Sequence, residues 1–210
     1  MTQPFNAIAL EYDSLWTETP TGRHQRLAVW KEIDQVFTPG SRILDLGCGT
    51  GVDAVHLQER GVDVTAIDSA PAMVAAACSH GVNAQCLAIE AVGNLPATFD
   101  GALSNFGALN CVRDLHAVAL HLSRLIRPHG TLALCLMGRI CWPEILRGLA
   151  LGDWQKASRR WRGTFTWRGI EVFYPTRAAV RAAFEPDFVL QRIRSLAGGD
   201  HWLSLWTRRP

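Results

Sequence analysis

Residues 43–51 read ILDLGCGTG, an apolar run that ends in an acid and three glycines at alternate positions. The apolar run predicts a buried strand, and the following GVDAVHLQER, residues 51–60, predicts a helix. A Gly-rich turn between a strand and a helix brings backbone N–H groups and a helix N-terminus to a ligand at the carboxyl edge of a sheet. The stretch therefore predicts a ligand site in which main chain lies close to the ligand.

The spacing of the glycines bears on the kind of ligand. A dinucleotide fingerprint is G-x-G-x-x-G, whereas Gly47, Gly49 and Gly51 follow G-x-G-x-G, so the third glycine comes one residue early. Asp45 stands two residues before the first glycine, where a negative charge would repel a pyrophosphate and suit a cationic amino acid moiety. The pattern therefore favours a cationic ligand over a dinucleotide.

Outward from this stretch, short apolar runs alternate with segments of helical periodicity. Strands are expected at 41–46, 62–68, 83–89, 99–105 and 131–137, with helices at 51–60, 70–80 and 112–125. Two further helices are expected before them, over 5–16 and 23–37, separated by the break TETPTG. Such alternation predicts a parallel sheet with helices on both faces.

The end of the chain departs from this alternation. Residues 139–163 are rich in Trp and Arg and are expected to be helical, and 164–175 to form a hairpin that turns at Arg168-Gly169. A helix over 175–184 leads to strands at 188–196 and 201–208, which the short AGGD loop makes antiparallel to each other. Seven strands with an antiparallel last pair differ from the ending of a six-stranded parallel dinucleotide fold.

Four motifs in this order resemble one family. ILDLGCGTG resembles motif I of the class I S-adenosylmethionine-dependent methyltransferases, VTAIDSAPAMV their second-strand motif, FDGALSNFGALN their fourth-strand motif, and LSRLIRPHGTLAL their helix, turn and fifth strand. The resemblance implies an α/β fold, a Rossmann-like three-layer sandwich. Its seven-stranded, mostly parallel sheet is expected to have strand order 3-2-1-4-5-7-6 and an antiparallel last strand.

The length of 210 residues suits a single domain with a real core. The resemblance divides this domain into four parts. They are an N-terminal helical lid (1–38), a cofactor-binding core (39–138), a substrate-cap insertion (139–175) and a C-terminal helix with the strand pair (176–210).

The resemblance also implies the cofactor S-adenosylmethionine, the product S-adenosylhomocysteine and a set of binding residues. Asp68 corresponds to the acid that takes both ribose hydroxyls, and Met73 to the residue packed on the adenine; singly, they also fit a helix N-cap and a core residue. Many relatives carry an Asp after the third strand, but this chain reads CLAIEAV, so either Glu90 or backbone near Ile89 meets the adenine amine. The expected cofactor set is Tyr12, Arg23, Asp45, Gly47, Cys48, Gly49, Asp68, Ser69, Met73, Ile89, Glu90, Asn105 and Phe106.

The N-terminal lid and the chemistry supply the catalytic candidates. Tyr12 of the Tyr12-Asp13 pair resembles a tyrosine near the methionyl end, and Arg23 is either a partner of the cofactor carboxylate or a surface residue. The sulfonium carbon is already electrophilic, so orientation and removal of water carry most of the catalysis, and a base helps only a neutral hydroxyl acceptor. The catalytic candidates are Tyr12, His24 and Asn110, with Tyr174 and His129 as further possible bases, of which His129 is expected to be remote.

Acceptor specificity is expected from the lid, from SNFGALN after the fourth strand and from the insertion. The insertion holds aromatic side chains at 142, 154, 161, 167, 173 and 174 among arginines 147, 159, 160, 162 and 168. These predict a cover with apolar anchors and a basic rim, compatible with an aromatic or lipid-like acceptor that bears a carboxylate or phosphate. The predicted activity is methyl transfer to oxygen, nitrogen or sulfur of a small molecule; the alternatives are a noncatalytic cofactor-binding sensor or assembly partner and a nicotinamide-dependent reductase.

Composition narrows the partners and the compartment. Residues 1–100 hold 12 acids and 5 bases, whereas 139–194 hold 5 acids and 11 bases, which fits either a solvated basic face or attraction of an anionic substrate. There is no polybasic tail, so no nucleic acid is expected, and no signal peptide or membrane span is expected. The six cysteines lack metal spacing, so neither disulfides nor a metal site is expected in this cytoplasmic monomer or homodimer.

Overall fold

The computed structural model describes residues 4–153, 158–196 and 200–210. A central sheet of seven strands has the order β3-β2-β1-β4-β5-β9-β8. Its strands are β1 (Arg42–Leu46), β2 (Asp63–Asp68), β3 (Asn83–Cys86), β4 (Phe99–Ser104), β5 (Ile126–Met137), β8 (Phe188–Ser195) and β9 (His201–Arg208). The first five strands pair in parallel, and β9 is antiparallel to both β5 and β8. The expected fold and strand order are therefore confirmed.

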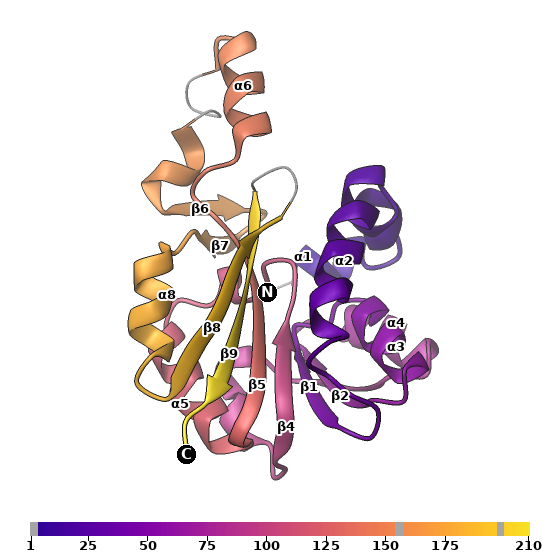
Figure 1. Ribbon diagram of the computed structural model, residues 1–210. Helices are drawn as coiled ribbons and strands as arrows, with labels where there is room; N and C mark the ends of the chain where they lie inside the picture. The colour runs from indigo at the N-terminus through magenta and orange to yellow at the C-terminus, as the bar shows by residue number, and fades with distance from the viewer. Residues whose placement is uncertain (1–3, 154–157, 197–199) are drawn as a thin grey trace.

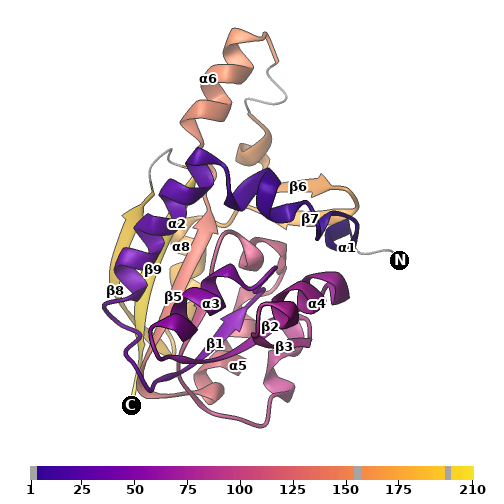
Figure 2. The same ribbon diagram turned by 90° about the vertical axis from the view of Figure 1, so that its right-hand side faces the viewer.

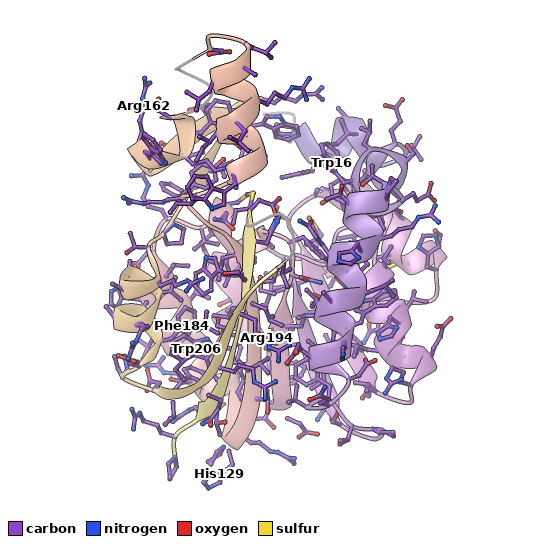
Figure 3. All side chains as sticks on the ribbon, turned by 45° about the horizontal axis from the view of Figure 1, so that its top comes forward. Trp16, His129, Arg162, Phe184, Arg194 and Trp206 are labelled. Atoms are coloured by element: carbon purple, nitrogen blue, oxygen red, sulfur yellow. The ribbon has the colours of Figure 1, made fainter. Side chains whose placement is uncertain are left out.

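Helices cover both faces of the sheet, which makes three layers (Figure 1). One face carries α2 (Pro20–Ile33), α3 (Val52–Glu59) and α4 (Pro71–Ser79), and the other carries α5 (Leu115–Leu125) and α8 (Arg177–Phe184). Successive strand residues point to opposite faces, so Ile43 joins the core under α2 and α3 while Leu44 joins the core under α5 and α8. Phe184 and Trp206 meet in this second core, with ring centroids 5.9 Å apart (Figure 3).

The N-terminal segment is not the single helix expected over 5–16. The structure has a short α1 (Pro4–Ile8), a turn, and one π-helical turn η1 (Asp13–Thr17) before α2. The break allows Ile8 and Ala9 to pack on Met73 of α4 while Leu10 lies fully in solvent. The Oγ1 of Thr19 accepts the N–H of Gly22 at 3.0 Å, so α2 begins at Pro20, earlier than expected.

Several connections between the strands are short 3₁₀ turns. These are η2 (Ile89–Asn94), η3 (Ala108–Cys111) and η4 (Arg159–Arg162). The third strand is shorter than expected, because the chain leaves the sheet after Cys86 and Ile89 begins the turn η2. The side chain of Asp114 accepts two backbone N–H groups and starts α5 at Leu115.

The segment after β5 rises beyond the carboxyl edge of the sheet. It contains α6 (Trp142–Ala150), η4 and the separate hairpin of β6 (Thr164–Trp167) and β7 (Ile170–Phe173), which turns at Arg168-Gly169 as expected. Figure 2 shows the hairpin beside α1, and Phe5 meets Trp167 with ring centroids 5.6 Å apart. Trp154 and most of the AGGD loop lie outside the described residues. The lid and the hairpin therefore face each other above the sheet.

Candidate active site

The glycine turn after β1 is shaped by left-handed backbone and by hydrogen bonds to the next strand. Gly47 and Gly49 have φ values of +72° and +55°, a region that favours glycine. The N–H groups of Gly47 and Cys48 donate to the carbonyl of Ile67 at 2.8 and 3.0 Å. A Cβ added at Gly49 would meet nothing within 4 Å, whereas one at Gly47 would lie 2.4 Å from the Cβ of Ala108. Gly49 therefore borders open space, and Gly47 allows close packing of the chain itself.

Asp68 at the end of β2 is fixed by the same turn. Its two carboxylate oxygens accept the N–H of Gly49 at 3.0 Å and of Ala70 at 2.9 Å. Burial raises the pKa of Asp68, and the hydrogen bonds from these N–H groups oppose that shift. Because each carboxylate oxygen has a second lone pair, Asp68 can still accept two further hydrogen bonds.

A first cavity of about 370 Å³ opens beside these groups, within the range of small-molecule sites. Ten of the expected binding residues line it: Tyr12, Gly47, Gly49, Asp68, Ser69, Met73, Ile89, Glu90, Asn105 and Phe106. Sequence reasoning missed the rest of its wall, which is Pro4, Phe5, Ala88, Gly107, Ala108, Cys111, Val112 and Ile170. Both Ile89 and Glu90 border this cavity, so the alternatives for the third-strand position stay open.

A second cavity of about 510 Å³ adjoins the first under the lid and the hairpin. Aromatic side chains from three segments dominate its apolar wall: Phe5, Trp16, Phe106, Phe165, Trp167 and Tyr174. Its polar wall includes Gln25, Arg26, Arg160, Asp200 and His201. Five residues line both cavities, namely Phe5, Tyr12, Phe106, Gly107 and Cys111. The two spaces therefore meet at one wall.

The carboxylate of Asp53 ties the lid helix to this wall. It forms an ion pair with Arg26 at 2.6 Å and accepts the indole N–H of Trp30 at 2.7 Å. It also accepts the side-chain amide of Asn105 at 2.9 Å, and the Arg26 guanidinium lies 4.7 Å from the centre of the Phe106 ring. These buried contacts hold α2, α3 and the end of β4 together.

Asp45 does not line either cavity. It points toward the α2 and α3 face, it is 2% exposed, and its Oδ2 has no hydrogen-bond partner among the described residues. Burial, with the nearby negative charge of Asp53, raises the pKa of Asp45 well above its ordinary value. Asp45 is thus a buried carboxyl beneath the glycine turn, and its expected part in cofactor binding stays a prediction. Cys48 likewise lies outside both cavity walls.

Three other expected residues are placed away from the cavities. Arg23 and His24 lie on the exposed face of α2, and the Nε of Arg23 donates to the carbonyl of Glu18 at 2.8 Å. Asn110 is fully buried, and its side chain bonds the backbone of Met137 and Phe173 at 2.6 to 3.1 Å. Asn110 therefore joins β5 to the hairpin, and its expected catalytic role stays a prediction.

The remaining catalytic candidates differ in where they lie relative to the two cavities. Tyr12 lies at the shared wall, and burial raises its pKa to about 12, so its phenol stays protonated near neutral pH. Tyr174 is buried in the second cavity, with the Arg160 guanidinium 5.3 Å from its ring centre. His129 lies at the opposite end of the molecule from Trp16, as Figure 3 shows, in agreement with the expectation that it is remote.

His201 is one of the titratable cavity residues that sequence reasoning missed, and it is the histidine among them. It begins β9, and its register partner is Met137 at the carboxyl end of β5. An antiparallel last strand must start at the edge where the parallel strands end, so the topology alone could have pointed to its first residue. In the described part of the chain, no group of three or more His, Cys, Asp or Glu side chains is arranged to hold a metal.

Comparisons with known proteins agree with this geometry. Residues 43–130, which include the glycine turn, Asp68 and Asn105, match the family model described as a methyltransferase domain. This match is to a methyltransferase domain and covers less than half of the chain. It agrees with the resemblance to the S-adenosylmethionine-dependent methyltransferases over the segment that carries most of the first cavity wall.

The chain is also similar to curated relatives and to solved structures. The chain is 34% identical over 112 residues to the ubiquinone biosynthesis O-methyltransferase of Xanthomonas campestris, which covers 50% of this chain and 46% of that protein. The S-adenosylmethionine-dependent methyltransferase from Mesorhizobium loti superposes with a TM-score of 0.67 at 18% identity, covering 91% of this chain and 99% of that one. The N-methyltransferase NodS from Bradyrhizobium japonicum, solved with S-adenosylhomocysteine, gives 0.67 at 15% identity, with 92% and 90% covered.

The matches cover different shares of the chain and of its relatives. The chain spans about half the length of the curated relatives it matches. The structural matches show that the whole described fold, and not only residues 43–130, is that of a class I methyltransferase. Within residues 4–153, 158–196 and 200–210, none of the helices has the length and hydrophobicity needed to traverse a bilayer.

Proposed function

We propose that the chain transfers a methyl group from S-adenosylmethionine to a small-molecule acceptor. The observation that carries this proposal is the pair of adjoining cavities with a common wall of Phe5, Tyr12, Phe106, Gly107 and Cys111. A transfer reaction needs two ligands whose reacting atoms approach one another in line. One cavity would hold the donor, the other the acceptor, and the common wall marks where they meet.

The first cavity fits the donor on three observations. The open space beside Gly49 leaves room for a ligand against bare main chain. Asp68 retains lone pairs for two ribose hydroxyls, and Met73 and Ile89 offer apolar surface to an adenine. The proposed orientation places the adenine toward Ile89 and Glu90 and the methionyl part toward Tyr12, Asn105 and Phe106.

The chain itself contributes orientation and exclusion of water. The bound donor supplies an electrophilic methyl carbon, so the protein has to align a nucleophile behind it and remove solvent. The lid is fastened over the glycine turn, because the Thr50 hydroxyl lies 2.9 Å from the Asp13 carboxylate and the Asn6 side chain accepts the N–H of Ala72 at 2.9 Å. Tyr12, with its raised pKa, acts at the wall as a neutral hydrogen-bonding group.

The second cavity supports an aromatic acceptor. Trp16, Phe165 and Trp167 supply faces on which a ring can stack. Arg26 and Arg160 line the same cavity, but each is paired with a carboxylate, that of Asp53 at 2.6 Å and that of Glu144 at 2.8 Å. The aromatic wall therefore carries this part of the proposal, ahead of charge attraction for an anionic acceptor.

The relatives and the cysteines refine the proposal. The curated relatives are named O-methyltransferases, which favours oxygen among the three acceptor atoms expected from the sequence. All six cysteines are free thiols, which supports a reducing compartment such as the cytoplasm. We further infer a monomer or homodimer that acts on a small molecule and not on nucleic acid.

Calorimetry followed by a turnover assay tests the proposal. The protein should bind S-adenosylmethionine and S-adenosylhomocysteine in preference to NAD(H) and NADP(H), and it should methylate a member of a panel of aromatic hydroxyl, amine and thiol compounds. Preferential binding of a dinucleotide would support the reductase instead. Tight binding of the sulfonium donor with no turnover across the panel would support the noncatalytic sensor.

A further inference from the structure

We propose that His201, oriented by Asp200, removes the proton from a hydroxyl acceptor during methyl transfer. This inference rests on the proposed function and adds to it a residue pair and the protonation state of the acceptor. It is carried by the placement of the pair in the second cavity and by the hydrogen bonds that fix Asp200.

The strand topology places His201 in the second cavity, beside the wall that the two cavities share. Because β9 runs antiparallel to β5, its first residue lies beside Met137 at the carboxyl edge of the sheet. The imidazole packs edge-on against Phe106, with ring centroids 5.6 Å apart and an interplanar angle of 76°. Phe106 lines both cavities, so His201 stands next to the common wall on the acceptor side.

Hydrogen bonds hold the Asp200 carboxylate next to the His201 imidazole. Its Oδ1 accepts the side-chain amide of Gln25 from α2 at 2.7 Å, and its Oδ2 lies 3.1 Å from the Nδ1 of His201. The backbone carbonyl of Asp200 accepts a hydrogen bond from the Arg160 guanidinium at 3.4 Å. The Nδ1 contact is electrostatic more than a well-aligned hydrogen bond, but it places a negative charge beside the ring.

The charge beside the ring suits a base. Burial would raise the pKa of Asp200, but the contact with His201 and the charge of Arg160 outweigh burial and hold that pKa below its ordinary value. Asp200 is therefore ionised near neutral pH, and its charge stabilises the imidazolium that forms when Nε2 takes a proton. Because Nδ1 lies 3.1 Å from the carboxylate, Nε2 is the nitrogen assigned to accept that proton.

The other ionisable groups of the cavity are unsuited to this role. Burial raises the pKa of Tyr12 to about 12 and that of Cys111 to about 11, so both stay protonated. Arg26 from α2 and Arg160 from η4 are cations paired with Asp53 and Glu144. Tyr174 also faces this space and is a phenol, a poor base while protonated. Of the described residues that line this cavity, only His201 is an imidazole.

Atoms and charge are conserved in the proposed methyl transfer. The acceptor O–H bond breaks and its proton moves to Nε2 of His201, while the oxygen electron pair forms a bond to the methyl carbon. The carbon–sulfur bond of the sulfonium breaks, and its electron pair stays on sulfur. The products are a methyl ether, S-adenosylhomocysteine and one proton, which His201 later releases to solvent. No oxidant or other reactant is required.

The proposal selects a neutral hydroxyl of low acidity, such as a phenol, as the acceptor class. A phenol with a pKa of about 10 is almost fully protonated near neutral pH and is then a weak nucleophile. A positioned base typically contributes about 10²- to 10⁴-fold to such a step. A neutral amine already offers a lone pair and gains little from the same base.

The decisive experiment combines His201→Gln with a series of phenols of increasing acidity. For phenols that stay protonated at the assay pH, kcat/KM should fall at least about 100-fold. For phenols acidified by ring substituents until they ionise below neutral pH, the loss should be much smaller, because no base is needed. Affinity for S-adenosylmethionine, measured by calorimetry, should match that of the wild type.

His116→Gln provides the matched control, because His116 is an exposed histidine of α5 that lines neither cavity. It should leave both kcat/KM and its dependence on phenol acidity unchanged. Asp200→Asn tests the positioning residue. It should lower kcat/KM for phenols that stay protonated and spare phenols that are already ionised, because only the orientation of the His201 imidazole is disturbed.

Three outcomes would overturn the inference. They are an equal loss for all phenols in His201→Gln, an equal loss for all phenols in Asp200→Asn, and turnover of amines or thiols but of no hydroxyl compound. In each case binding of S-adenosylmethionine would leave the proposed function standing. Absence of that binding in the wild-type protein would instead refute the proposed function itself.

Discussion

The two cavities are built in different ways from the same chain. The first is lined mostly by residues at or after the ends of β1, β2, β3 and β4, including Gly47, Gly49, Asp68 and Asn105. The second is lined by side chains from segments as distant in sequence as Phe5 and His201. Local sequence motifs specify most of the first cavity, whereas the second cavity depends on how distant segments of the chain pack together. The cavity proposed for the donor can therefore be predicted from the sequence, whereas the cavity proposed for the acceptor cannot.

The largest expected effect tests the role of bare main chain in the first cavity. Gly49→Val would place a branched side chain into space where the chain itself has no atom within 4 Å, so it should fold yet lose S-adenosylmethionine binding by roughly 100-fold or more. Gly40→Val is the matched control, because Gly40 also has a positive φ and open surroundings but lies outside both cavities. Calorimetry measures both, and full binding by the Gly49 variant would contradict the proposed donor position.

The next effect tests the Asp68 carboxylate of the first cavity, which is the proposed donor site. Asp68→Ala should weaken S-adenosylmethionine binding by about 1.5–3 kcal/mol, or roughly 10- to 150-fold, through loss of charged hydrogen bonds to the ribose. Asp63→Ala, at the exposed start of the same strand, should bind normally. An unchanged affinity in the Asp68 variant, measured by calorimetry, would mean that the ribose lies elsewhere.

A smaller effect is expected in the cavity made of side chains. Trp167 packs against Phe5 and Trp16, with ring centroids 5.6 and 6.3 Å away. Trp167→Ala should raise the KM for an aromatic acceptor by up to about tenfold, since aromatic contacts contribute about 0.5–1.5 kcal/mol each. Trp161→Ala, an exposed tryptophan outside both cavities, should leave that KM unchanged. If both variants behave alike in steady-state assays, the aromatic wall does not bind the acceptor.

The smallest effect concerns the wall between the cavities. Tyr12→Phe removes one neutral hydroxyl and should reduce S-adenosylmethionine affinity only roughly threefold. Since burial raises the pKa of Tyr12 to about 12, its phenol does not ionise below pH 9. The pH profile of kcat/KM between pH 5 and 9 should therefore keep its shape. A limb that disappears in this variant would assign the titration to Tyr12.

The fold and the donor cavity could be predicted because they depend on short-range patterns. The strand and turn pattern from Ile43 to Gly51, with Asp68 at the next strand end, needs only local periodicity and the rule for parallel sheets. The lid could not be predicted in the same way. Arg23 and His24 lie in a polar run, RHQR, whose composition does not show which residues face inward, and the inward ones are Gln25 and Arg26.

Other departures have a similar physical origin. Asn110 follows the fourth strand where substrate and cofactor were expected to meet, but its amide satisfies the buried backbone of Met137 and Phe173. Asp45 stands beside the glycine turn in sequence, yet strand alternation directs it to the helix-covered face. In both cases the neighbourhood in space, and not the neighbourhood along the chain, decides what the side chain does.

Asp53 belongs to neither cavity wall, yet it accepts Arg26 from one wall and Asn105 from the other. A molecule that displaces either partner changes the electrostatic field felt by the other through the same carboxylate. Thermodynamic reciprocity then requires that any gain in donor retention caused by an acceptor be returned in equal measure to the acceptor. One buried acid thus gives the scaffold a way to couple the affinities of the two cavities.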